Sequence, residues 1–149
     1  MADRSRRLTA SQAAGLTLER ARQVIGAVEA AARAMRVAMS VAVVDSGDQL
    51  VAFERMDGAD LVTIDLARDK AFSALVNRMS TADLAPLVQP GAEFYGYDSL
   101  AGGRMIVFAG GTPLERDGVL VGAIGVSGGS ADQDQRAAEA GVAAFDQRE

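Results

Sequence analysis

The sequence predicts an α+β domain in which helices cover a mostly antiparallel sheet. Residues 10–36 and 131–146 carry apolar side chains at helical spacing, so a long helix is expected near each end of the chain. Between them, apolar runs come in pairs that turn-forming residues separate, which is typical of hairpins. Each helix has one apolar face to bury, and packing both helices on the sheet buries those faces.

Length and composition are those of a globular domain. The chain has 149 residues, of which 49% are hydrophobic and 5% aromatic. We expect residues 1–149 to form one domain with a core built mainly from aliphatic side chains. The net charge is −5 and the only basic block is Arg4, Arg6 and Arg7, so nucleic acid is not an expected partner.

The chain contains neither histidine nor cysteine. A Ser-His-Asp triad, a histidine-ligated haem and a thiolate metal site are therefore excluded. Asp45, Asp48 and Asp57 lack the spacing of a calcium loop, so no metal site is expected. No apolar run is long enough to span a membrane, and the first residues, MADRSRRLTASQ, lack the apolar core of a secretory signal. A cytoplasmic location is the resulting expectation.

The first half of the chain predicts a helix, a hairpin and two further helices. Thr9 and Gln12 have the spacing of a capping box at the start of the first helix. The segments expected to be regular are a helix at 10–36, strands at 39–44 and 50–55, a helix at 60–77 and a short helix at 81–88. Ser80 or Thr81 is expected to cap the short helix.

The second half of the chain is richer in glycine. Residues 91–105 are expected to be irregular, 105–109 to form a strand and 110–118 to form a glycine-rich connection. The run VLVGAIGVSG, residues 119–128, is apolar enough to be a central strand. A helix at 131–146 follows.

The turn between the last strand and the last helix has two interpretations. Free N–H groups at the helix start, with the hydroxyls of Ser127 and Ser130, would bind a carboxylate or phosphate. Alternatively, Ser130 caps the helix itself, and Asp132 and Asp134 complement the helix dipole. Capping is the commoner use of such residues.

Two cations are candidates for binding an anionic group. Arg55 follows a predicted strand, and its planar guanidinium suits a carboxylate. Lys70, with Arg68, is expected to approach the same end of the sheet. The alternative for Arg55 is a surface ion pair with Asp57 or Glu54, which would contribute little.

The irregular segment and the connection after it hold further candidates. Tyr95 and Tyr97, the only tyrosines, could stack on a flat ligand, cover one edge of the core or line a subunit contact. Gly110 and Gly111 permit a close backbone approach, although a tight turn alone would also explain them.

The motifs together resemble a known family. The segments VAVVDSGDQLVAFERMDGA (41–59), ARDKA (67–71) and the glycine-punctuated stretch 110–145 are similar to the GlcG/HbpS-like haem-binding or haem-degrading family. They also resemble the C-terminal domain of PduO-type corrinoid adenosyltransferases. This resemblance implies a profilin-like fold with a five-stranded antiparallel sheet, homo-oligomers from dimers to octamers, and haem or a corrinoid as ligand.

Haem binding would have to proceed without histidine. Tyrosine and methionine also ligate haem iron, which makes Tyr95, Tyr97, Met56 and Met105 candidates. Arg55, Lys70 or the 127–130 turn would hold a propionate. We expect the affinity to be weak.

Two functions from different classes remain open at this stage. The first is a binding module for haem, a corrinoid or another small molecule. The second is an enzyme that acts on a small organic acid or carbonyl compound, with Lys70, Glu93, Asp57 or a tyrosine as acid–base groups. A third reading is an oligomeric accessory protein with an empty site.

Overall fold

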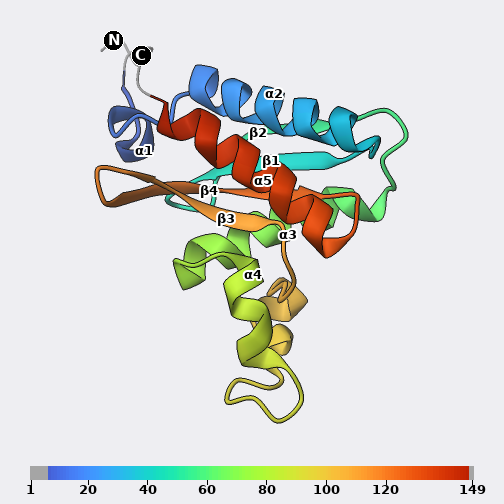
Figure 1. The fold of residues 1–149 in the computed structure, drawn as a ribbon. Helices are drawn as coiled ribbons and strands as arrows, with labels where there is room; N and C mark the ends of the chain where they lie inside the picture. The colour runs from blue at the N-terminus through green and yellow to red at the C-terminus, as the bar shows by residue number, and fades with distance from the viewer. Residues whose placement is uncertain (1–6, 148–149) are drawn as a thin grey trace.

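The computed structural model describes residues 7–147, and these fold into a sheet with helices on both faces (Figure 1). Arg4 and Arg6 of the basic block lie outside the described residues. The elements are α1 (Ala10–Ala13), α2 (Leu18–Met35), β1 (Ser40–Asp45), β2 (Leu50–Arg55), α3 (Val62–Asn77), α4 (Thr81–Leu84), the 3-10 turns η2 (Ala85–Val88), η3 (Tyr97–Ser99) and η4 (Ala101–Gly103), β3 (Gly111–Arg116), β4 (Val119–Ser127) and α5 (Ala131–Asp146).

The sheet confirms the predicted α+β class with antiparallel pairing. Its strand order is β2-β1-β4-β3, and each neighbouring pair is antiparallel. In the register, Val43 of β1 lies opposite Ala52 on one side and Ile124 on the other. The apolar run predicted to be central is β4, whose residues from Val121 onward are buried.

The prediction of five strands is wrong for the described chain, in which the sheet has four strands. Residues 105–109, predicted as a strand, instead run along α3, where the amide of Ile106 donates to Ser73 Oγ at 2.7 Å. The third strand lies within the segment predicted as a connection. It is an edge strand, and an edge position tolerates Pro113 and the exposed Glu115. Because of these two residues, the segment does not show the sequence pattern of a strand.

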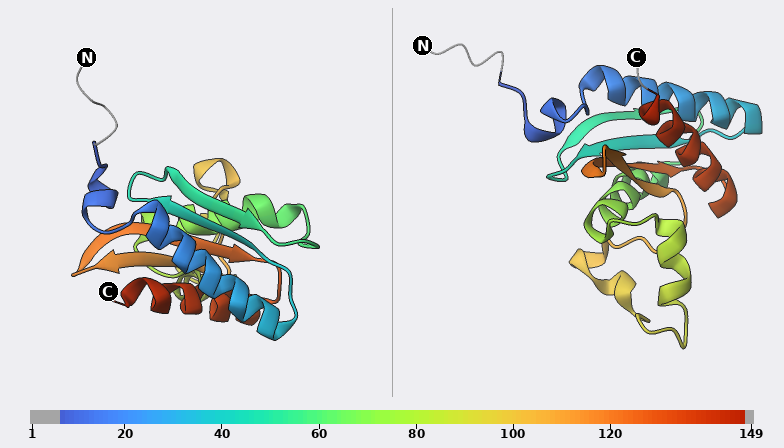
Figure 2. Two further views of the ribbon diagram at one scale, coloured as in Figure 1. Left: turned by 90° about the horizontal axis from the view of Figure 1, so that it is seen from above. Right: turned by 60° about the vertical axis from the view of Figure 1, so that its left-hand side comes forward.

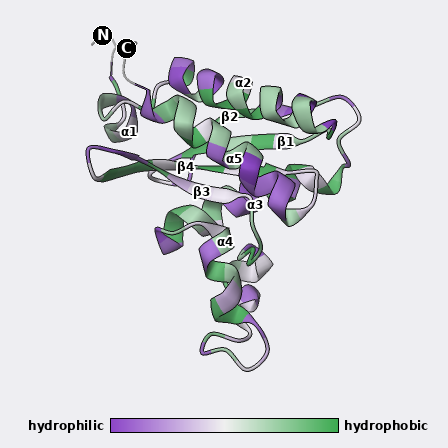
Figure 3. Ribbon diagram, in the orientation of Figure 1, coloured by the Kyte–Doolittle hydropathy of each residue, from purple (hydrophilic) through white to green (hydrophobic). Residues whose placement is uncertain are grey.

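Helices α2 and α5 form a layer on one face of the sheet (Figures 1 and 2). Their apolar stripes bury the main core together with β1, β3 and β4. Along α2 the ribbon alternates between hydrophilic and hydrophobic residues, as an amphipathic helix should (Figure 3). The buried members of this core are Leu16, Ala21, Val24, Ile25, Val28, Ala32, Met39, Val41, Val43, Leu114, Val121, Ile124, Val126, Ala137, Ala138 and Phe145.

Helix α3 covers the opposite face and lies unusually close to β4. A Cβ atom added at Gly125 would overlap the backbone oxygen of Ala67, and one at Gly111 would overlap the backbone oxygen of Lys70. The absence of side chains at these two positions therefore sets the distance between the helix and the sheet.

The predicted helix at 10–36 is two helices, α1 and α2. The helix is interrupted at Gly15, which has a φ of 108°. Glycine adopts this angle readily, whereas other residues would be strained there. Thr17 then caps α2 by accepting from the amide of Arg20 at 3.2 Å. The predicted capping box at Thr9 and Gln12 is confirmed.

Residues 81–109, which we call the arm, project away from the sheet (Figures 1 and 2). Ser80 caps α4 at the base of the arm by accepting from the amide of Asp83 at 3.0 Å. A small cluster of Leu84, Val88 and Met105 holds the arm together. Within residues 7–147, no helix is both long and apolar enough to cross a bilayer.

Gly125→Ala should lower the free energy of unfolding by more than about 3 kcal/mol, because α3 would have to leave β4 to admit the methyl group. Gly26→Ala is the matched control. Gly26 is exposed in mid-helix with nothing within 4 Å of a new Cβ, so its replacement should raise stability by about 0.5–1 kcal/mol. Urea unfolding of both variants checks this, and equal stabilities would contradict the close approach.

Candidate functional site

A buried ion pair lies where α3, the end of β4 and the start of α5 meet. Lys70 Nζ donates to Asp134 Oδ2 at 2.7 Å and to the backbone oxygen of Val126 at 3.0 Å. The second carboxylate oxygen of Asp134 accepts from the amide of Gly129 at 2.7 Å. Both charged side chains are buried, so the pair joins the layers on the two faces of the sheet.

The ammonium of Lys70 is buried and makes two hydrogen bonds. Desolvation by burial lowers the pKa of Lys70 below its ordinary value, and the hydrogen bond and charge of Asp134 oppose this shift. The ring of Phe108 lies 5.0 Å from Nζ and covers it further. In this arrangement Lys70 holds the fold together rather than facing a ligand.

Gly110 packs directly against this pair and Gly111 against the backbone of Lys70, so both allow a close backbone approach. A Cβ at Gly110 would lie 2.9 Å from Lys70 Nζ and 3.1 Å from Asp134 Cβ. The amide of Gly111 donates to Thr81 Oγ1 at 2.9 Å, which ties the base of the arm to β3.

The turn before α5 is capped by its own residues. Ser130 Oγ accepts from the amide of Gln133 at 3.2 Å, and Gln133 Oε1 accepts from the amide of Ser130 at 3.0 Å. Ser127 is buried, and the amide of Gly129 is taken by Asp134. The capping interpretation is confirmed, and an anion at Ser127 and Ser130 stays a prediction.

Arg55 lies apart from this centre, at the end of β2. It lines a cavity of about 320 Å³ with Glu29, Arg33, Met56 and Asp57. Within residues 7–147 Arg55 forms no ion pair, so the alternative of a surface pair with Asp57 or Glu54 is wrong.

A carboxyl pair lies at the same corner. The pKa of Glu54 is raised because its side chain shares a hydrogen bond with the carboxyl group of Glu29, with burial and the charge of Glu29 adding to the shift. Glu29 also accepts from Arg33 at 2.9 Å. At this corner the carboxyl group of Glu54 therefore holds its proton more tightly than usual.

The three candidate acid–base residues occupy three different regions. Lys70 belongs to the buried pair, Asp57 is exposed after β2, and Glu93 is exposed on the arm. The structure therefore does not bring them into one site.

The two tyrosines have different surroundings. The hydroxyl of Tyr97 donates to Asn77 Oδ1 at 2.7 Å, and its ring packs on the arm cluster. Tyr95 is 69% exposed, and within the described chain its hydroxyl has no hydrogen-bond partner. Phe94 and Leu100 are exposed on the same arm.

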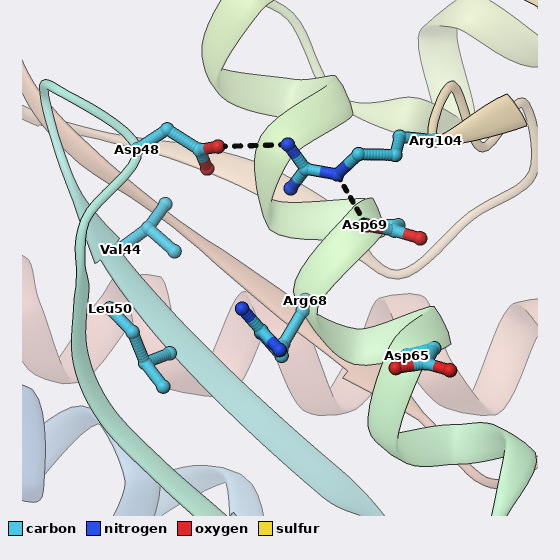
Figure 4. A pocket seen from close by; sticks show the side chains of 7 residues that line it. All are labelled: Val44, Asp48, Leu50, Asp65, Arg68, Asp69 and Arg104. Carbon is cyan, nitrogen blue, oxygen red and sulfur yellow. Dashed lines mark hydrogen bonds and ion pairs between the residues drawn. The ribbon is translucent and has the colours of Figure 1, made fainter. Parts of the chain in front are cut away.

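A further cavity, which we call the Arg68 pocket, lies between the β1–β2 hairpin and α3 (Figure 4). Its volume is about 310 Å³. Arg104 closes one side by pairing with Asp48 at 3.1 Å and with Asp69 at 2.9 Å. The lining residues are Val44, Asp48, Leu50, Asp65, Arg68, Asp69 and Arg104.

Most of this pocket was missed from the sequence, because its residues come from three separated segments. One signal was available. Arg104 is the only charged residue between Asp98 and Glu115, and a lone charge in a glycine-rich stretch indicates a specific partner. Although the pocket holds three aspartates, no group of three or more acidic residues within 7–147 is placed to hold a metal ion.

The fold is a small α+β domain, as the resemblance of the sequence motifs to the GlcG/HbpS-like family implies. The chain belongs to the HbpS-like family, because the family model described as "Haem degrading protein HbpS-like" matches residues 16–143. The predicted resemblance is therefore confirmed.

Individual relatives agree with this assignment. An uncharacterised 15.0 kDa protein of Citrobacter freundii, from the dhaT-dhaS intergenic region, is 37% identical over 90% of this chain and 94% of its own length. The corrinoid adenosyltransferase PduO of Citrobacter freundii is 36% identical, and the match covers 94% of this chain but 42% of PduO. A solved structure of a PduOC:heme complex superposes with a TM-score of 0.84 and 37% identity, over 88% of this chain and 95% of that one.

Lys70→Met should lower the free energy of unfolding by about 3–5 kcal/mol, because it leaves the Asp134 carboxylate buried without its partner. The double variant Lys70→Met/Asp134→Leu removes both charges and should recover most of that loss. Arg136→Gln is the control, since the exposed Arg136–Asp132 pair contributes about 0–1 kcal/mol. Urea unfolding measures all three, and a single variant as stable as the control would refute the role of the pair.

Proposed function

We propose that this protein binds haem on its arm, with the Tyr95 phenolate as the iron ligand. The observation that carries the proposal is the exposed Tyr95, whose hydroxyl has no hydrogen-bond partner within residues 7–147, on the same arm as the exposed apolar side chains of Phe94 and Leu100. A phenolate is an established ligand of ferric haem, and apolar side chains suit the face of the macrocycle. The PduOC:heme complex supports haem as the ligand class.

The other candidate iron ligands are engaged elsewhere. The hydroxyl of Tyr97 donates to Asn77, whose amide in turn donates to Met105 Sδ at 3.1 Å. Met56 Sδ accepts from the amide of Met39 at 3.4 Å. Each would have to give up a hydrogen bond to reach iron, whereas Tyr95 would give up none.

The open surface predicts a modest affinity. A haem lying on the arm would keep one face in water, so less apolar area would be buried than in an enclosed pocket. We propose binding rather than catalysis, because Lys70, Asp57 and Glu93 lie in separate regions. A corrinoid shares the flat macrocycle and is the alternative ligand for the same surface.

Tyr95→Phe should weaken hemin binding by about tenfold or more, because it removes only the oxygen that ligates iron. The measurement is a titration followed at the Soret band. Tyr97→Phe is the matched control and should bind hemin as the parent protein does. Cobalamin titrated in parallel tests the corrinoid alternative.

Two results of the Soret titration would contradict the haem proposal. If both tyrosine variants shift the Soret band as the parent does, or if the shift does not saturate near one hemin per chain, Tyr95 is not the ligand.

We also propose that the protein is a cytoplasmic homo-oligomer of two to eight chains. Leu61 and Val62, adjacent at the start of α3, are 74% and 62% exposed, and such neighbouring apolar side chains favour a protein contact.

Light scattering after size exclusion should give a multiple of the 15.4 kDa chain mass. Leu61→Ser/Val62→Ser should shift the protein toward smaller species, because it removes the apolar contact. A mass of one chain at every concentration would contradict the oligomer, and an unchanged oligomer in the variant would place the contact elsewhere.

A further inference from the structure

We propose that the Arg68 pocket binds a small aliphatic monocarboxylate, at a site separate from the proposed haem surface. The ligand carboxylate would pair with the guanidinium of Arg68, and its short hydrocarbon chain would lie against Val44 and Leu50. The proposal rests on the charges, contacts and size of this cavity.

One wall of the pocket is already fixed. Arg104 donates from Nε to Asp69 and from Nη1 to Asp48, and its guanidinium lies 4.0 Å from the centre of the Phe72 ring. Burial alone would lower the pKa of Arg104, but the hydrogen bonds and charges of Asp69 and Asp48 raise it, so this wall keeps its charge. These contacts of Arg104 hold the β1–β2 hairpin, helix α3 and the end of the arm around one cavity. The site is therefore preformed.

Of the two arginines that line this cavity, Arg68 is the one without a partner among residues 7–147. Within residues 7–147 its guanidinium makes no hydrogen bond and no ion pair, although Asp65 lies one turn away on α3. Its side chain extends from α3 toward the side of the pocket that carries Val44 and Leu50 (Figure 4). A guanidinium offers parallel N–H donors that match the two oxygens of a carboxylate.

The rest of the lining defines the ligand more closely. Val44 and Leu50 provide apolar surface beside the guanidinium. The volume of about 310 Å³ is near the lower end of small-molecule pockets, which favours a short chain. Asp65, which also has no ion-pair partner within the described chain, would repel a second negative charge. A monocarboxylate therefore fits better than a dicarboxylate.

The test is a titration of the ¹⁵N-labelled protein with sodium butyrate, followed by amide chemical shifts. We expect saturable shifts in the β1–β2 hairpin and in α3 around Arg68. Butyramide has the same shape without the charge and should produce no saturable shift. Arg68→Gln should weaken butyrate binding by about tenfold or more, because it removes a charge-assisted pair.

Three further variants keep the test specific. Arg55→Gln removes an exposed arginine outside the pocket and should leave butyrate affinity unchanged. Asp65→Asn removes the repelling carboxylate, so it should tighten butyrate binding and admit succinate, which the parent protein should bind more weakly than butyrate. Tyr95→Phe should bind butyrate as the parent does, so that loss of haem binding and loss of this site are distinguished.

Several results would overturn the proposal. Equal shifts with butyrate and butyramide would show that charge is not recognised. Equal affinities in Arg68→Gln and Arg55→Gln would show that Arg68 is not the anion site, and shifts that never saturate would show that there is no site.

Discussion

The buried pair of Lys70 and Asp134 is the interaction on which the rest of the structure depends. It crosses from the helix on one face of the sheet to the helix on the other, past the end of β4. A buried charge is tolerated only while it has its partner. If either helix moved, one charge would be left buried and unpaired, which would cost several kcal/mol, about 3–5. The pair thus fixes the relative positions of the layers.

The same pair limits where a ligand can bind. Gly110 packs over it without room for a side chain, and Gly111 carries the chain from there into β3 and the base of the arm. A lysine held in this way is not free to bind a propionate or to act as a base. Two groups that stay available lie at the periphery: the exposed Tyr95 on the arm, and Arg68 beneath the hairpin, which forms no ion pair within residues 7–147. Both proposed binding sites therefore lie outside the rigid centre.

The sequence predicted those parts of the fold whose signal is local. The first hairpin, the central apolar strand, the capping box at Thr9 and the helix cap at Ser130 follow from short patterns, and the structure confirms them. The edge strand β3 was missed because its sequence, GTPLER, shows no alternation of apolar and polar residues and contains a proline, which an edge strand tolerates. The burial of Lys70 was missed for a related reason. Its partner lies 64 residues away in the sequence, and a local sequence pattern cannot predict so distant a partner.

The crystal structure of the protein with hemin bound tests the central claim most directly. The account predicts iron bonded to Tyr95 Oη on the arm, with Lys70 Nζ still on Asp134. Iron held by any other residue, or a Lys70 side chain that has left Asp134 to meet a propionate, would contradict it.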